Sequence, residues 1–274
     1  MTDDYETTLV QLAASLHVVH VAHRPLRTVS AQASMAEAHA IATSQTLNNL
    51  PVVDDADGIV GVIENLNGEI EKYARPREDV RAVRYAMRPL SDRMLIESQS
   101  SLEGMLVDLL SPPYYQLVVT AGQIDGIVTV ADLNKAPVRV LSYATIAHLE
   151  TAMAHAIRRL TNGDDESAVA ALGDDAAAQV ADAHRRLRRG ALNADLLDAT
   201  TLRQKGVILV GLGVFRDAGD RTVETEFKHL YERLRNPLMH MSPFVAESID
   251  GLRAFAADLE QARHRTRQAL AASA

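Results

Sequence analysis

The sequence predicts an α+β protein in which a tandem βαββ unit is followed by an all-α bundle of four or five helices. Over residues 24–137, short apolar strands alternate with a helix and with turns rich in Asp and Gly. This pattern occurs twice, with Gly61 and Gly126 at equivalent positions 65 residues apart. From residue 138 onward, apolar residues recur at helical spacing and no strand pattern remains.

Each copy of the repeat contains the same predicted elements in the same order. The first copy, residues 24–85, has a strand, a helix and a hairpin of two strands, at 27–30, 34–47, 50–53 and 59–63. The second copy, residues 86–137, repeats them at 94–96, 101–110, 116–119 and 126–128. Residues 1–23 are interpreted as a lead-in segment that packs on the first copy.

The second half, residues 138–274, is predicted to be helical throughout. Helices are expected at 141–160, 175–189, 201–215 and 223–234. Ser242 and Pro243 are typical of an N-cap and a first helical position, so a last helix is expected to run from there to about residue 270. A short-looped set of helices of this kind indicates a bundle.

Composition excludes several classes of protein. Apolar residues make up 47% of the chain and charged residues 23%, which excludes disorder along its whole length. The chain has no Cys, which excludes disulfides, thiolate metal sites and a Cys nucleophile. The longest apolar run, Gly206–Phe215, is far shorter than the roughly 20 residues of a membrane span. We therefore expect a cytoplasmic protein with no membrane association.

The duplicated half resembles a tandem pair of CBS domains. The resemblance depends on Leu-Pro-Val-Val-Asp at 50–54, Ala-Met-Arg-Pro-Leu at 86–90 and Gly-Ile-Val-Thr-Val-Ala-Asp-Leu at 126–133. It implies a compact α/β module that binds a regulatory adenine nucleotide (AMP, ADP, ATP or a related ligand) in a cleft between the copies.

Within that resemblance, Thr129 and Asp132 match the nucleotide-binding positions of the family. A carboxylate can accept hydrogen bonds from both ribose hydroxyls, and a Thr hydroxyl can bind a phosphate. The first copy has Glu64 and Asn67 at the equivalent positions, and Glu64 would repel a phosphate. We therefore expect at most one nucleotide site per pair. The alternative is that Asp132 only caps the turn after the strand and nothing binds.

The segment between the last two predicted helices contains Arg235, Asn236 and His240, which suit phosphodiester cleavage. A His with an ordinary pKa near 6.5 can accept or donate a proton at neutral pH. Arg can bind a phosphate bidentately, and Asn can orient the His ring. The alternative is structural: Arg235 caps a helix end and His240 fills a loop.

This Arg-Asn-x-x-x-His motif, followed by a long final helix, is similar to that of the HEPN family of helical domains. Glu150 and Arg158 on the first helix of the bundle, and residues 196–202, agree with the family pattern. The resemblance implies a metal-independent endoribonuclease that acts as a homodimer. Each chain supplies one His, so a dimer would supply both an acid and a base. No metal site is indicated.

RNA binding requires a basic surface, and arginines cluster near the end of the helix at 175–189. The candidate RNA-binding residues are Arg185, Arg186, Arg188, Arg189 and Arg233. A second cluster, Arg263, Arg265 and Arg267, is interpreted rather as a solvated face balanced by nearby acids, because residues 141–274 hold 17 Lys and Arg against 18 Asp and Glu.

These observations favour a ligand-regulated endoribonuclease, in which the CBS pair senses an adenine nucleotide and a dimeric helical bundle cleaves RNA. The alternative function is a non-catalytic nucleotide sensor whose bundle only dimerises or binds a partner.

Overall fold

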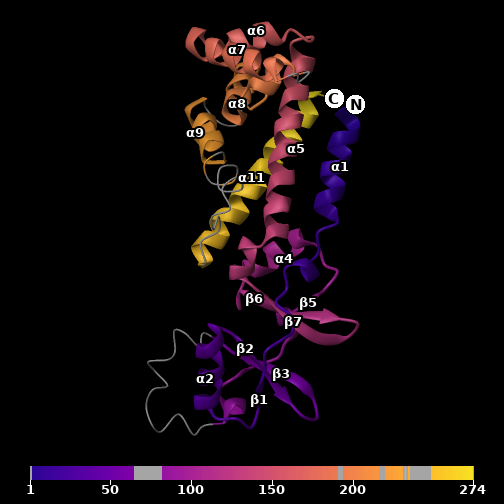
Figure 1. The fold of residues 1–274 in the computed structure, drawn as a ribbon, viewed down its shortest axis with the longest axis vertical. Coiled ribbons are helices and arrows are strands. Elements are labelled where there is room, and N and C mark those ends of the chain that lie inside the picture. Colours follow the sequence, from indigo (N-terminus) through magenta and orange to yellow (C-terminus); the bar gives the residue numbers. More distant parts are fainter. Residues whose placement is uncertain are drawn as a thin grey trace. The chain divides into compact units, whose positions relative to one another are not determined.

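The computed structural model describes residues 2–64, 82–190, 194–215, 220–230, 232, 234 and 248–273. The chain divides into two compact units (Figure 1). The α/β unit comprises His17–Asp132, and the helical unit comprises Met1–Leu16 together with Leu133–Ala274. The predicted arrangement of a mixed α/β half followed by a helical half is therefore confirmed.

The α/β unit contains two sheets with the same internal order. In the first, β1 (Val29–Ser30) pairs in parallel with β2 (Leu50–Asp54), which pairs antiparallel with β3 (Gly58–Ile63). In the second, β5 (Leu95–Glu97) pairs in parallel with β6 (Tyr115–Thr120), which pairs antiparallel with β7 (Gln123–Thr129). Helices α2 (Met35–Gln45) and α4 (Leu102–Leu109) connect the parallel strands. The predicted βαββ duplication is thus confirmed.

The two hairpins match in detail at the offset of the sequence repeat. Each has a bulge at the same place, between Val52 and Val53 and between Val118 and Val119. Gly61 and Gly126 lie next to these bulges. A side chain on Gly61 would collide with Met87 and Arg88, and one on Gly126 would make tight contacts of 3.1–3.3 Å with Arg24 and His23. The absence of a side chain at both positions lets a neighbouring segment approach the sheet.

The approaching segments are exchanged between the copies. Arg88 and Pro89, at the start of the second copy, form β4 and pair with β3 of the first sheet. In the reciprocal contact, His23 pairs with Ile127 on β7 of the second sheet. Residues 17–23 therefore pack on the second copy, because their backbone hydrogen bonds go to residues 98–101 and 127. The predicted packing of this segment on the first copy is wrong.

Local sequence signals explain where the helices of this unit begin. The Ser34 hydroxyl accepts a hydrogen bond from the Glu37 amide, and the Glu37 carboxylate accepts one from the Ser34 amide, which completes a capping box for α2. Ser101 caps α4 with a single bond, because its hydroxyl accepts a hydrogen bond from the Gly104 amide at 3.1 Å. The core of the second copy includes Val62 from β3 of the first, so the two copies share buried apolar contacts.

The helical unit is arranged around α5 (Ala136–Leu160), which packs against α11 (Ile249–Ser273), α1 (Thr2–Ala14) and α8 (Leu202–Gly211). Figure 1 shows α11 running beside α5. Apolar residues at helical spacing, such as Leu149, Met153 and Ile157, form the buried face of α5. Three further helices are α6 (Asp165–Ala170), α7 (Asp174–Arg189) and α9 (Asp220–Leu230).

Two helices were not predicted, and both contain many polar residues. The six-residue helix α6 lies where a loop was expected, and Asp164 caps it by accepting a hydrogen bond from the Ser167 amide. The helix α1 occupies most of the predicted lead-in segment and buries Leu9 in the helical unit. The boundary at the N-terminus therefore lies at Leu16, earlier than the predicted residue 23.

In the part of the chain that the structure describes, no helix combines the length and apolar character required to cross a membrane.

Candidate functional site

The predicted nucleotide-binding pair, Thr129 and Asp132, lies where β7 ends and the 3-10 helix η4 (Val130–Asn134) begins. One carboxylate oxygen of Asp132, Oδ2, accepts hydrogen bonds from the Thr129 amide at 2.7 Å and from the Thr129 hydroxyl at 3.0 Å. Only 8% of Asp132 is exposed. The two donors stabilise a carboxylate that would otherwise be costly to bury.

This turn places a hydroxyl and a carboxylate side by side at the end of a buried strand. Val128, directly before Thr129, is fully buried and holds the strand in the core. The alternative role considered for Asp132, capping of the turn after the strand, is present in the structure, because its carboxylate accepts a hydrogen bond from the Thr129 amide. The turn also holds the Thr129 hydroxyl and the Asp132 carboxylate together.

The equivalent position in the first copy, Glu64, is part of a polar network that joins both copies. Its Oε1 accepts a hydrogen bond from the Tyr115 hydroxyl at 2.9 Å, and the Arg88 Nε donates to the same oxygen at 2.8 Å. Tyr115 is buried at the start of β6. Burial raises the pKa of Tyr115 well above its usual value, and the bond to the Glu64 carboxylate adds to that effect.

Glu64 departs from the nucleotide motif in the sequence, but its partners Tyr115 and Arg88 could not be predicted from that departure. Arg88 compensates the charge of Glu64, so this position is occupied by an ion pair rather than by an isolated carboxylate. The one signal for this contact in the sequence was the repeat offset of 65 residues, which makes Arg88 equivalent to His23. Both residues belong to the segments that pair with the sheet of the other copy. Asn67, the other residue of the first-copy position, lies outside the described residues.

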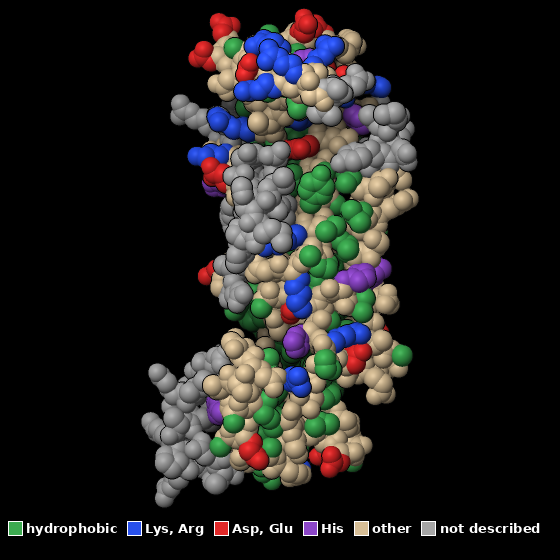
Figure 2. Space-filling view, viewed as in Figure 1, with side chains coloured by type: hydrophobic (Ala, Val, Ile, Leu, Met, Phe, Trp, Pro, Cys, Tyr) green, Lys and Arg blue, Asp and Glu red, His purple; other side chains and the backbone are tan. Residues whose placement is uncertain are grey.

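The predicted RNA-binding arginines on α7 are exposed, and they fall into two pairs. Arg185 and Arg186 both form ion pairs with Asp182, at 3.3 and 2.8 Å. Arg188 and Arg189 are exposed, and among the described residues no carboxylate lies within ion-pair distance of either. Figure 2 shows Lys and Arg side chains gathered over the α6–α7 end of the helical unit.

Cations at this end of α7 also have an ordinary structural explanation. The helix begins with Asp174 and Asp175 and ends with Arg188 and Arg189, so charges of opposite sign stabilise its two ends. The charges of these arginines are therefore explained by the helix itself, and RNA binding by them stays a prediction.

Two of the three C-terminal arginines, Arg265 and Arg267, are paired with carboxylates. Arg265 is buried in contact with Glu226 on α9, with two hydrogen bonds of 2.8 Å, and its guanidinium lies 4.9 Å from the Phe215 ring centroid. Arg267 is exposed and pairs with Glu260 at 2.8 Å. The interpretation of this cluster as balanced by acids is consistent with these pairs, although the burial of Arg265 was not predicted.

Arg158, one of the residues that suggested the HEPN resemblance, connects the end of α5 to neighbouring segments. It pairs with Asp195 at 2.9 Å and with Asp165 at 3.8 Å. Desolvation on burial raises the pKa of Asp165, and Arg158 opposes that rise. These contacts are sufficient to explain Arg158 as a structural residue.

The predicted catalytic residues Arg235, Asn236 and His240 lie outside the described residues, as does Arg233. They belong to the segment between α9 and α11. Among the residues that the structure does describe, no group of three or more His, Cys, Asp or Glu side chains is placed to bind a metal ion.

Comparison with known proteins gives one family match. Residues 18–64 match the family model of the CBS domain. No curated protein matches the chain in sequence.

Solved structures that are similar to part of this chain are distant from it in sequence. The CBS domain of a bacterial CNNM/CorC family Mg²⁺ transporter, in complex with ATP, is 16% identical over 52% of this chain and 97% of its own, with a TM-score of 0.40. The CBS-pair protein CBSX2 from Arabidopsis thaliana is 22% identical over 46% and 96%, with a TM-score of 0.40. A structure of CBSX2 with AMP is 23% identical over 46% and 98%, with a TM-score of 0.37.

The family match covers β1, α2, β2 and β3 together with the segment that precedes them. Residues 18–64 are therefore a CBS domain.

Proposed function

We propose that this protein binds an adenine nucleotide at the second copy of the α/β unit, and that the bound nucleotide controls the helical unit. The observation that supports this is the turn at Thr129 and Asp132, where a hydroxyl and a carboxylate are held together at the end of a buried strand. The CBS resemblance implies these residue types for a phosphate and for ribose hydroxyls.

The two copies differ in a way that favours one nucleotide per chain. The second copy has the neutral Thr129 at the phosphate position, whereas the first copy has Glu64 already bonded to Arg88 and Tyr115. A nucleotide in the first copy would have to disrupt that network and approach a carboxylate. Both changes oppose binding of an anion.

The position of Asp132 in the chain provides a route for control. Asp132 lies within η4, and the long helix α5 begins at Ala136, four residues later. A ligand that binds two conformations of this turn unequally shifts the population between them. The change is then passed directly to the first residues of α5.

The test is calorimetric titration of the full-length protein with AMP, ADP and ATP. We expect at least one of them to bind with a stoichiometry near one per chain, and Asp132→Ala to weaken that binding about 10- to 100-fold, since a hydrogen bond to a charged group is worth roughly 1.5–3 kcal/mol. Asp57→Ala, which removes an exposed carboxylate from the first hairpin, is the matched control.

Circular dichroism of Asp132→Ala must accompany the titration, because Asp132 also supports its own turn. The absence of binding for all three nucleotides would refute the proposal. A folded Asp132→Ala variant that binds as tightly as the wild-type protein would refute the assigned site.

For the helical unit we propose, as the output of this control, metal-independent cleavage of RNA by a homodimer. The support is the Arg-Asn-x-x-x-His motif at residues 235–240 together with the exposed arginines on α7. Arg235 would hold the scissile phosphate, and His240 of two chains would act as base and acid.

Purified protein incubated with labelled RNA in EDTA tests this second function. We expect cleavage, and a loss of about 100-fold or more in His240→Ala, as for removal of a general acid or base. His229→Ala, an exposed His on α9, should cleave normally. If the wild-type protein leaves RNA intact in EDTA, the helical unit serves only to dimerise or bind a partner.

A further inference from the structure

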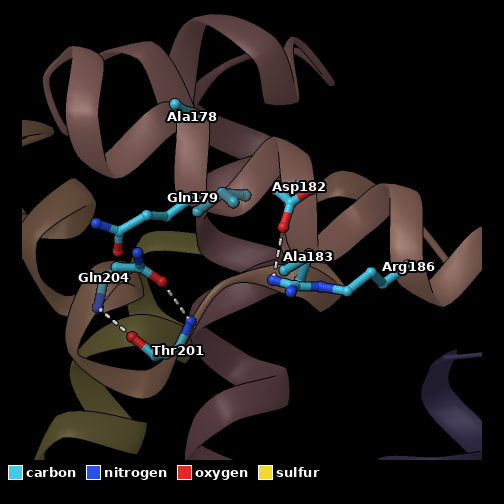
Figure 3. A pocket seen from close by; sticks show the side chains of 9 residues that line it. Ala178, Gln179, Asp182, Ala183, Arg186, Thr201 and Gln204 are labelled. Carbon is cyan, nitrogen blue, oxygen red and sulfur yellow. Dashed lines mark hydrogen bonds and ion pairs between the residues drawn. The ribbon is translucent and has the colours of Figure 1, made fainter.

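A pocket of about 510 Å³ lies between α7 and the start of α8 (Figure 3). Helix α7 contributes Gln179, Asp182 and Arg186 to its wall, and the start of α8 contributes Thr201 and Gln204. Small apolar side chains complete the lining. The pocket is therefore a concave site with a few convergent polar groups, which is the usual form of a small-ligand site.

The local sequence explains why these polar groups are held in place. Four lining residues on α7 share one face of the helix, because they follow the spacing of three and four residues that corresponds to one helical turn: 179, 182, 183 and 186. On the opposite wall, Thr201 and Gln204 form the capping box of α8, with hydrogen bonds of 2.8 and 3.2 Å. The box fixes the Gln204 side chain at the edge of the pocket, as Figure 3 shows.

The two charged residues that line the pocket, Asp182 and Arg186, have opposite signs and form an ion pair. Arg186 is paired with Asp182 at 2.8 Å, and Arg185 also approaches Asp182 at 3.3 Å. Only Asp182 and Arg186 of these three residues line the pocket, and they compensate each other, so the interior offers an anion little net attraction. The interior instead suits a neutral ligand whose edge both donates and accepts hydrogen bonds.

The carboxamides in the pocket provide that complementary pattern. Gln179 is exposed, and no partner for its side chain occurs among the described residues. A carboxamide has one acceptor and one donor group, which is the combination that binds the edge of a nucleobase. Unpaired bases of single-stranded RNA are accessible for such contacts, whereas paired bases are not.

We propose that the α7–α8 pocket binds one base of single-stranded RNA, with Gln179 contacting the base edge. Arg189 lies one turn beyond Arg186 on the same face of α7, where it is exposed and placed to bind the adjoining phosphate. This inference rests on the proposed action of the helical unit on RNA. It adds a subsite on α7 and α8, away in the sequence from the motif at residues 235–240.

The experiment is fluorescence anisotropy of the full-length protein with a labelled single-stranded RNA of twelve nucleotides, in EDTA. His240→Ala is the background for all variants, so that the RNA stays intact. We expect Gln179→Ala to weaken binding about tenfold, within the range for a bidentate side-chain contact to one base edge. Ala183→Phe, which fills the pocket, should weaken binding to a similar extent.

Matched controls separate the pocket from general effects. Gln11→Ala removes an exposed Gln from α1 of the same unit, and Arg93→Ala removes an exposed Arg from the α/β unit. Both should bind RNA within twofold of the background protein. Arg189→Ala should weaken all RNA sequences alike and reduce the salt dependence of binding.

The outcomes distinguish this inference from the proposed function. If the background protein binds RNA but Gln179→Ala and a folded Ala183→Phe bind equally well, the pocket is not a base site, and action on RNA remains supported. If the background protein binds no RNA, both the pocket assignment and the action on RNA are overturned. Because Gln179 is exposed, its substitution tests the pocket even if Ala183→Phe fails to fold.

Discussion

Single residues at equivalent positions of the repeat have taken different roles. Thr129 begins a turn that holds a carboxylate, whereas Glu64 serves as the acceptor for two residues of the second copy, Arg88 and Tyr115. The same backbone position therefore bonds to a turn-capping carboxylate in one copy and makes contact between the copies in the other.

The Tyr115 hydroxyl provides a test of that second role. Glu64→Ala removes its acceptor and should lower the free energy of unfolding by about 1–3 kcal/mol, the usual cost of leaving a buried polar group unpaired. Glu64→Ala with Tyr115→Phe should recover part of the loss, and Glu97→Ala, an exposed carboxylate on β5, should be neutral. Urea unfolding measures all three. Equal stability of Glu64→Ala and wild type would show that the network contributes nothing.

Asp165 provides a pH-dependent test. Burial raises its pKa in the folded protein, and one of its carboxylate oxygens is buried without a hydrogen-bond partner among the described residues. At pH values between the usual pKa of Asp and the raised pKa of Asp165, the folded state therefore binds more protons than the unfolded state. The contribution of Asp165 to the free energy of unfolding thus increases as the pH falls through this interval and decreases as the pH rises.

Asp165→Asn should accordingly gain most in stability over wild type near pH 7.5, and the gain should shrink near pH 5. Urea unfolding at both values, with Asp175→Asn as an exposed control in the first turn of α7, measures the difference. A gain that grows on acidification would contradict the assigned direction.

At the scale of elements, α9 and α11 are joined by the buried pair of Glu226 and Arg265. These two helices flank the segment with the proposed catalytic motif. Arg265→Met leaves the Glu226 carboxylate without its cation and should cost about 3–5 kcal/mol. Glu226→Met with Arg265→Met should recover most of that, because an apolar pair avoids the desolvation of two charges.

The exposed pair of Glu260 and Arg267 on α11 is the matched control. Arg267→Ala should cost no more than about 1 kcal/mol, as surface ion pairs do. Thermal and urea unfolding compare the variants. A similar small cost for Arg265→Met would show that the buried pair does not hold the two helices together.

The elements that could be predicted from the sequence are those with local signals. Alternating strands, Asp- and Gly-rich turns and the offset of 65 residues were sufficient for both βαββ copies. The helices α1 and α6 were missed because their apolar residues are few and their burial depends on contact with other elements. Contacts between distant residues could not be predicted in this way. Arg265 has the sequence pattern of a surface cation, but it is buried against Glu226, which lies 39 residues away in the chain.

At the scale of the whole molecule, one chain would combine two functions. The α/β unit would sense an adenine nucleotide through Thr129 and Asp132, and the helical unit would act on RNA. The HEPN resemblance, the homodimer and the cytoplasmic location stay predictions. A sensor is useful only if ligand changes the output, so the link between the two units is the claim on which the account depends.

The most direct test is the rate of RNA cleavage by the full-length protein in EDTA, measured with and without a saturating adenine nucleotide. We expect the nucleotide to change the rate several-fold, since typical coupling free energies correspond to roughly 5- to 150-fold. The change should disappear in Asp132→Ala, and Asp57→Ala should retain it. Cleavage at one rate in the presence and absence of a nucleotide that demonstrably binds would contradict the account.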